Sequence, residues 1–290
     1  MNRPACLRSS SRDNLKIMLR LETETGYWLI THVDHANLAG AFAARWGNEF
    51  FKAPEPRAHV LKGISQHDDG WRERDARPQI TRQGRPSAFS VELVGKYSAF
   101  EEIDLADYLA VRDRAVRLIA GEDPYAAILV SMHTYNLLSE RADRTTIVPA
   151  QLGLLDDFLA RLRLLEQSMR EEIARDQRFT AEEKSDIAIR DHFRLLQATD
   201  NLSLLTCVDY RKPATLLHPL PLNDGGYRTV AVESVRERTF RLSPYPFAEP
   251  SLTFTFPARH VEGKVFSHAD DLGERLAAAP VVYLEVTVVA

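Results

Sequence analysis

The sequence predicts an α+β protein with a mainly helical body and one small β-sheet. Between residues 34 and 206, apolar residues recur at helical spacing between capping residues and prolines. Before residue 32 and after residue 210, short runs alternate in polarity or are rich in β-branched residues, which is typical of strands. Because strands need partners, we expect the N-terminal and C-terminal strands to pair in one small sheet.

Composition excludes several classes of protein. The chain has 290 residues, a net charge of -4 and no conspicuous Lys/Arg cluster, so we expect no nucleic-acid partner. No apolar run has the length of a membrane span or the pattern of a signal peptide, so we expect no membrane association and a cytoplasmic protein. The chain has two cysteines, Cys6 and Cys207, so we expect no disulfide framework, and we expect Cys207 to be a buried thiol.

Three segments are expected along the chain. Residues 1–14 are polar and aperiodic, and we predict a disordered extension. Residues 15–210 are predicted to form the helical domain together with the N-terminal strands. Residues 211–290 are predicted to be a β-rich segment packed on the same domain.

The first elements follow from local signals. "LKIMLRLETETGYWLITH" predicts two short strands joined by a tight turn. "DHANLAGAFAARWGN" then changes to helical spacing, with Asp34 as the expected N-cap and Gly47 as the expected end. A second helix is predicted over 54–70, opened by a proline and closed by Gly70. Residues 71–100 predict a long irregular stretch.

The later elements are predicted in the same way. Asp104 and Asp123 are expected to cap two successive helices, and an amphipathic helix is expected from 150 to about 176. Thr180 and Glu183 predict a capping box for the last helix. Four strands are predicted after residue 209, in "YRTVAVE", "RTFRLSP", "SLTFTFPARHV" and "VVYLEVTVV".

The stretch "LKGISQHDDGWRER" contains a His67-Asp68 doublet that is weak by itself, in a chain with nine histidines. Asp200 strengthens it, because Ile189, Phe193 and Leu196 precede it at helical spacing and place it on an apolar stripe. A carboxylate facing a core is costly, and a cation would remove that cost. The alternative is that Asp200 pairs with an arginine or accepts backbone hydrogen bonds.

The order His, His-Asp, Asp on successive helices resembles the HD-domain superfamily of metal-dependent phosphohydrolases. The resemblance implies an HD-like helical bundle that holds one metal ion. A first-helix His, the doublet and a late-helix Asp would be its ligands, and four residues match them one for one: His35, His67, Asp68 and Asp200.

His133 resembles the additional histidines of the dinuclear members of that superfamily. Those members usually have two such histidines, and His192 lies about 12 Å along a helix from Asp200, too far to share one ion. We therefore expect one divalent transition metal, Zn, Mn, Ni or Fe, with two ions as the alternative.

A closer resemblance covers most of the chain. "LITHVDHANLAGAFAARWGN", "HDDGW", "PYAAILVSMHTYNL", "ATDNLSLL" and "LSPYPFAEPSL" resemble a bacterial family known only as a domain of unknown function. The resemblance implies a common fold and a common site, but no substrate. Members of that family tend to start near Met18.

The leading functional hypothesis is a metal-dependent hydrolase of a small phosphate ester or nucleotide. His133 would bind a second metal, contact the phosphate or act as a general acid, and Asp69 would assist catalysis by orienting a ligand imidazole. His32 is either close to the ligands or a polar strand end. Four arginines are candidate phosphate contacts: Arg72, Arg74, Arg141 and Arg190.

Two alternatives remain. An iron-dependent oxygenase would use the same cavity, and a ligand-binding or scaffold protein would keep the fold without catalysis. A homodimer could form through a sheet edge or through the helix over 150–176.

Overall fold

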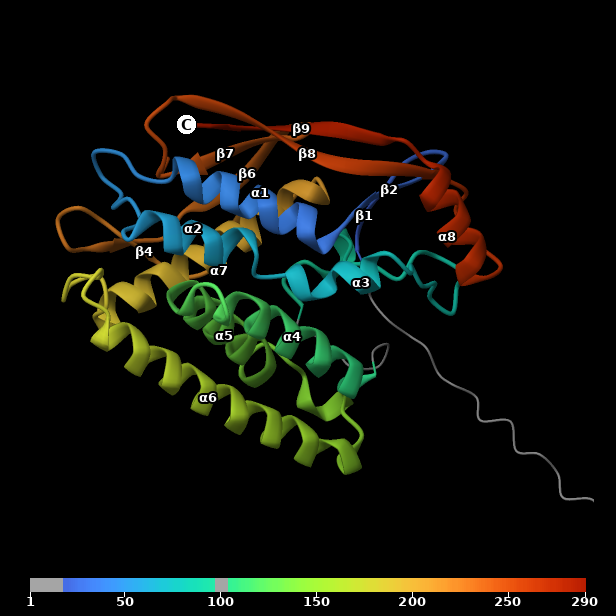
Figure 1. Cartoon of the computed structure of the whole chain (residues 1–290). Coiled ribbons are helices and arrows are strands. Elements are labelled where there is room, and N and C mark those ends of the chain that lie inside the picture. Colours follow the sequence, from blue (N-terminus) through green and yellow to red (C-terminus); the bar gives the residue numbers. More distant parts are fainter. Residues whose placement is uncertain (1–17, 97–103) are drawn as a thin grey trace, which may run out of the picture.

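The computed structural model describes residues 18–96 and 104–290, so the extension predicted over 1–14 lies outside the described residues. A broad curved sheet forms one side of the molecule, and the helices are stacked below it (Figure 1). Helix α1 (His32–Arg45) packs between strand β8 (Ser251–Glu262) and helix α7 (Asp186–Cys207), while α6 (Leu152–Arg175) lies farthest from the sheet.

The sheet is where the predicted fold class is wrong. The described residues form a seven-stranded mixed sheet, not a small sheet on a mainly helical HD-like bundle. In sheet order its strands are β1 (Leu19–Glu22), β2 (Gly26–Ile30), β8, β9 (Val281–Val289), β7 (Thr239–Ser243), β6 (Ala231–Arg236) and β3 (Ala214–Thr215).

Non-local pairing explains the error. The predicted N-terminal hairpin forms, but β2 then pairs with β8, more than 200 residues later in the chain. Strand β9 pairs antiparallel with β8 on one side and parallel with β7 on the other. A strand pattern gives the length of one strand but not its partners, so the size of the merged sheet could not be derived from it.

The helices follow the local signals closely. Asp104 and Asp123 accept hydrogen bonds from the first turns of α4 and α5, as predicted. Among the described residues, the remaining α-helices are α2 (Arg57–Ser65), α3 (Arg72–Asp75), α4 (Leu105–Ala120), α5 (Pro124–Ser139) and α8 (Ala269–Ala278). Helix α2 is shorter than the helix predicted over 54–70, and neither α3, in the stretch predicted to be irregular, nor α8 was predicted. None of the helices in residues 18–96 and 104–290 has the length and apolar character that a membrane span requires.

Two helix starts differ from the prediction. Thr31, not Asp34, is the N-cap of α1, and its hydroxyl donates to the Asp34 carboxylate. The hydrogen bonds of the predicted capping box between Thr180 and Glu183 do form, but they close a separate turn. Helix α7 starts later and is capped by Ser185, because the short serine side chain accepts from the first turn of that helix.

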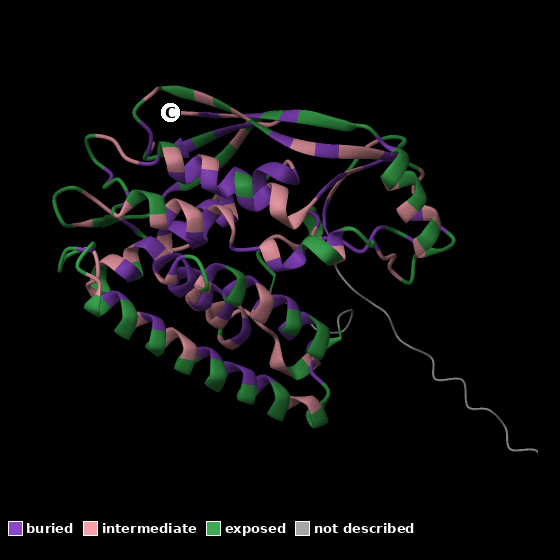
Figure 2. Ribbon diagram, in the orientation of Figure 1, coloured by how far each residue is buried: buried purple, intermediate pink, exposed green. Residues whose placement is uncertain are grey.

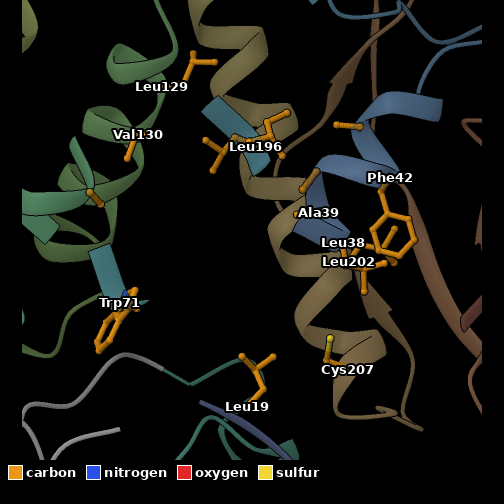
Figure 3. Close-up of a cluster of buried hydrophobic side chains, with 14 of the residues drawn as sticks. Leu19, Leu38, Ala39, Phe42, Trp71, Leu129, Val130, Leu196, Leu202 and Cys207 are labelled. Atoms are coloured by element: carbon orange, nitrogen blue, oxygen red, sulfur yellow. The ribbon is translucent and has the colours of Figure 1, made fainter. Parts of the chain in front are cut away.

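The core extends from the sheet through α5 to the inner face of α6, as the buried residues in Figure 2 show. Figure 3 shows Leu38 and Phe42 of α1 beside Leu202 of α7, with Cys207 near the end of α7. Cys207 is a buried free thiol, as expected. Residues 125–131 of α5 are completely buried and His133 is only 2% exposed, so the His133 side chain lies in a low-dielectric environment.

Candidate functional site

Five predicted residues from four parts of the chain meet inside this core. His35 comes from the first turn of α1, and His67 and Asp68 follow the end of α2. His133 projects from α5 and Asp200 from α7. All five are at least nine-tenths buried.

Small residues let these helices approach one another closely. A Cβ atom on Gly40 of α1 would lie 2.6 Å from the Cβ of Ser65 on α2. A Cβ atom on Gly63 would lie 3.0 Å from the carbonyl oxygen of Ala126 on α5. Glycine at both positions therefore allows the end of α2, with the doublet, to reach the buried histidines.

The side chains make a compact group. His35 Nε2 lies 3.1 Å from Asp68 Oδ2, and His67 Nε2 lies 3.4 Å from Asp200 Oδ1. His35, His67 and Asp200 offer ligand atoms that all lie within 4.8 Å of one another, and so do His67, Asp68 and His133. Imidazole nitrogens and carboxylate oxygens at this spacing could hold a transition metal ion.

The tautomers of two histidines favour a cation between them and the carboxylates. His67 Nδ1 donates to the carbonyl oxygen of Ile64 at 2.7 Å, so Nε2 carries the lone pair of the neutral ring. That buried Nε2 has no hydrogen-bond partner among the described residues. Its nearest polar neighbours are carboxylate oxygens, which repel a lone pair unless a proton or a metal ion lies between them.

His35 repeats this arrangement. Ser203 Oγ donates to the carbonyl oxygen of Asp200, so it accepts from His35 Nδ1, which lies 3.0 Å away. The lone pair of His35 Nε2 then faces Asp68 Oδ2. In metal sites the second ring nitrogen of a ligand histidine is usually fixed by such a donor bond.

Arg112 is a further member of this group that was not predicted from the sequence. Its Nη1 donates to Asp68 Oδ1 at 2.6 Å, and the residue is only 6% exposed. The signal was present, because Arg112 follows Tyr108 by four residues and Leu109 by three, on the buried face of α4. The reasoning applied to Asp200 would have identified this buried cation and predicted a carboxylate partner for it.

The pKa values of the group follow from these contacts. Burial acts to lower the pKa of His67, but Asp68 and Asp200 outweigh it and raise the pKa to about 9. Burial acts to raise the pKa of Asp68, but Arg112 and His67 hold it well below its usual value. Burial also acts to raise the pKa of Asp200, and its interaction with the His67 ring 3.4 Å away lowers the pKa overall. Both carboxylates are therefore ionised, and a proton occupies His67 Nε2 when no metal ion does.

His133 differs from the other two histidines. The amide of Gln197 donates to His133 Nδ1 at 2.7 Å, which places the ring proton on Nε2. Burial lowers the pKa of His133 to about 3, so the ring stays neutral. In this tautomer His133 is a hydrogen-bond donor, and only the reversed amide of Gln197 would free its Nε2 as a ligand.

A second group lies beside the first. His32 Nδ1 lies 2.9 Å from Asp75 Oδ1, and the His32 backbone N–H donates to the other oxygen of that carboxylate. The His32 ring stacks on Trp71 with a centroid distance of 4.3 Å. Because Asp75 accepts from Nδ1, His32 Nε2 carries a lone pair. Sequence reasoning kept His32 only as an alternative and missed Asp75, because no periodic pattern joins these two positions.

Other predicted residues lie outside this group. Asp69 pairs with Arg72 at 3.4 Å, and Arg74 pairs with Asp107. Arg190 is exposed on α7. Asp69 makes no hydrogen bond to the buried group among the described residues, so no contact supports its predicted catalytic role.

The candidate metal-binding group, made of His35, His67, Asp68, His133 and Asp200, borders a cavity of about 210 Å³. His32, His35, Asp68, His133 and Asp200 line one part of it, together with Arg112 and Gln197. Apolar side chains line another part, and Arg141 is the one predicted phosphate contact that lines it among the described residues. The cavity gives a small ligand access to the buried histidines and carboxylates.

Comparisons with known proteins give a family but no activity. Neither the curated proteins nor the solved structures include a match to this chain. The model of one family matches residues 18–263, which is most of the chain, and it does not extend the assignment to the HD-domain superfamily. The chain therefore belongs to the family described as "Protein of unknown function (DUF3891)".

Proposed function

We propose that this protein binds one divalent transition metal ion and hydrolyses a small phosphate ester. The ligands would be His35, His67, Asp68 and Asp200. The observation that carries the proposal is the buried Nε2 atom of His67, which faces two carboxylates without a hydrogen-bond partner among the described residues. Binding there would satisfy a polar atom that is otherwise costly to bury.

Charge supports an anionic substrate. With Asp68, Asp200 and Arg112 ionised, the group carries one net negative charge before any proton or metal ion is added. A divalent ion with neutral histidines would reverse the sign and attract a phosphate. When bound, the ion would lower the pKa of a water molecule and polarise a phosphoryl oxygen.

The residues around the group supply the remaining chemistry. His32 Nε2 would take a proton from the attacking water and return it to the leaving alcohol oxygen as the phosphorus–oxygen bond breaks. Asp75 would hold His32 in the required tautomer and stabilise its protonated form, and Trp71 would fix the ring plane. His133 would donate a hydrogen bond to the phosphate from Nε2, which fits its neutral ring better than the role of general acid.

Metal analysis of the purified protein tests the proposal first. We expect one equivalent of metal in the wild type, and its loss in His67→Ala and Asp200→Asn but not in His268→Ala, which changes an exposed histidine. Hydrolysis of p-nitrophenyl phosphate after loading with Zn, Mn, Ni or Fe then tests the reaction, with His32→Gln as a variant that should keep the metal and lose the activity.

Protein that stays metal-free under all loading conditions would overturn the proposal in favour of a non-catalytic binding protein. Two irons per chain would instead favour the oxygenase. Full activity in His32→Gln would refute the role given to that residue.

A further inference from the structure

The cavity beside the metal-binding group is lined by both charged and apolar side chains, and the apolar ones indicate what the organic part of the substrate is. The lining includes the histidines, carboxylates and Arg112 already described. The other lining residues are mainly hydrocarbon side chains, with Tyr108, Asn201 and two cations among them. The inference drawn from this lining rests on the proposed function and concerns the substrate of the same site.

The apolar wall begins one helical turn from the metal-binding group. Leu137 follows His133 by four residues on α5, and Leu204 follows Asp200 by four residues on α7, about 6 Å along each helix. Other apolar residues complete the wall: Leu19, Phe89, Leu93 and Leu217. Sugar hydroxyls placed against these leucine and phenylalanine side chains would lose hydrogen bonds to water that hydrocarbon cannot replace, which costs free energy. A hydrocarbon group would gain from the same burial.

Arg141 and Lys96 give the cavity a second positive region. Both line it, and neither forms an ion pair with a carboxylate in residues 18–96 and 104–290. Arg141 lies eight residues after His133, just beyond the end of α5, so the apolar Leu137 separates it from the metal-binding group. An arginine without a carboxylate partner at the edge of a cavity is suited to binding a carboxylate or phosphate of a ligand.

We propose that the substrate is a phosphate ester with a hydrocarbon body and a second anionic group at its far end. The phosphate would lie at the metal-binding group, the hydrocarbon against Leu137 and Leu204, and the second anion at Arg141. This assignment disfavours sugar phosphates and nucleotides as substrates.

Calorimetric titration with phosphonates tests the assignment without depending on turnover. The probes are methylphosphonate, hexylphosphonate and 6-phosphonohexanoate, each titrated into zinc-loaded and metal-free protein. We expect hexylphosphonate to bind at least tenfold more tightly than methylphosphonate, because its chain adds buried methylene groups. The terminal carboxylate of 6-phosphonohexanoate should increase the affinity for the wild type by a further factor of ten relative to hexylphosphonate.

Variants separate the two parts of the site. Arg141→Gln should remove the gain from the carboxylate and leave the affinity for hexylphosphonate unchanged, while Arg190→Gln on the surface of α7 should change neither. Leu137→Asn, at a half-buried position, should weaken the binding of hexylphosphonate and leave the binding of methylphosphonate unchanged.

The results distinguish this inference from the proposed function. If zinc binds but hexylphosphonate gains nothing over methylphosphonate, the hydrocarbon-binding wall is refuted while the metal site stands. A carboxylate gain that survives in Arg141→Gln refutes the placement of the second anion at Arg141, and no gain in the wild type refutes the second anion site. Absence of zinc binding refutes the metal site alone, and the ranking in metal-free protein then still decides the substrate class.

Discussion

Replacing Arg112 by methionine should strongly destabilise the metal-free protein. Methionine also has a long, unbranched side chain, but it has no donor for Asp68 Oδ1, which lies 2.6 Å from Arg112 Nη1. The Asp68 carboxylate is only 4% exposed, so it would lose its arginine partner inside the core. Removing one partner of a buried ion pair costs about 3–5 kcal/mol.

A second arginine on the same helix provides the matched control. Arg117 pairs with Asp113 one turn away, but both side chains are well exposed. Arg117→Met should therefore cost at most about 0.5 kcal/mol. The contrast between two arginine-to-methionine changes on α4 separates burial of the pair from the loss of an arginine as such.

Urea unfolding of the metal-free and zinc-loaded forms is the assay. In the loaded form the cost of Arg112→Met should be smaller, because a divalent ion beside Asp68 supplies the positive charge that the arginine no longer provides. If Arg112→Met and Arg117→Met lower the free energy of unfolding of the metal-free protein by the same amount, the buried pair of Arg112 and Asp68 does not have the assigned energy. If zinc leaves the cost unchanged, the ion does not share Asp68 with Arg112.

Three further predictions concern metal affinity, ligand orientation and pH. Zinc at a thousand times its dissociation constant should raise the free energy of unfolding by about 4 kcal/mol, and no rise in calorimetry would contradict a native-state site. Ser203→Ala, which removes the acceptor for His35 Nδ1, should weaken zinc binding by about 10–100-fold in a competition titration, and unchanged affinity would argue against the assigned tautomer. Burial lowers the pKa of His192 to about 4, whereas the pKa in the unfolded chain is near 6.5. The neutral ring therefore contributes fully to the free energy of unfolding above pH 6.5, and this contribution, about 3 kcal/mol in total, is lost as the pH falls toward 4. His192→Gln should therefore flatten the decline of stability between pH 7 and pH 4.5 in urea unfolding, and equal slopes would show that His192 is not buried as a neutral ring.

In this protein, features that depend on residues close in the chain could be predicted from the sequence, and features that depend on distant residues could not. Asp104 and Asp123 were predicted as helix caps because each acts on a backbone N–H three residues away. The pairing of β2 with β8 depends on contacts across more than 200 residues, and no residue in either strand specifies its partner. The long helices α1, α4, α5, α6 and α7 could therefore be predicted from local signals, while the short helices α3 and α8 and the sheet could not.

The site divides in the same way. Asp200 stood out because a carboxylate on an apolar helical stripe requires compensation, and the same argument would have identified Arg112. The pair of His32 and Asp75 joins the start of α1 to the short helix α3, and its geometry depends on how the intervening chain folds back. Residues on long regular helices can thus be assigned from spacing, whereas partners on short turns need the structure.

Charge balance connects the buried group to its proposed chemistry. Asp68 and Asp200 together exceed the single positive charge of Arg112, so the metal-free core needs one more proton, and His67 holds it. A divalent ion would displace that proton and leave the group with a net positive charge, which buried groups tolerate only with an anion nearby. Metal binding and anion binding should therefore reinforce each other. Methylphosphonate should bind more tightly to zinc-loaded than to metal-free protein in the same calorimetric titrations, and zinc should bind more tightly in its presence by the same factor. Independent binding of the two would show that Arg112 and His67 already neutralise the core without the ion.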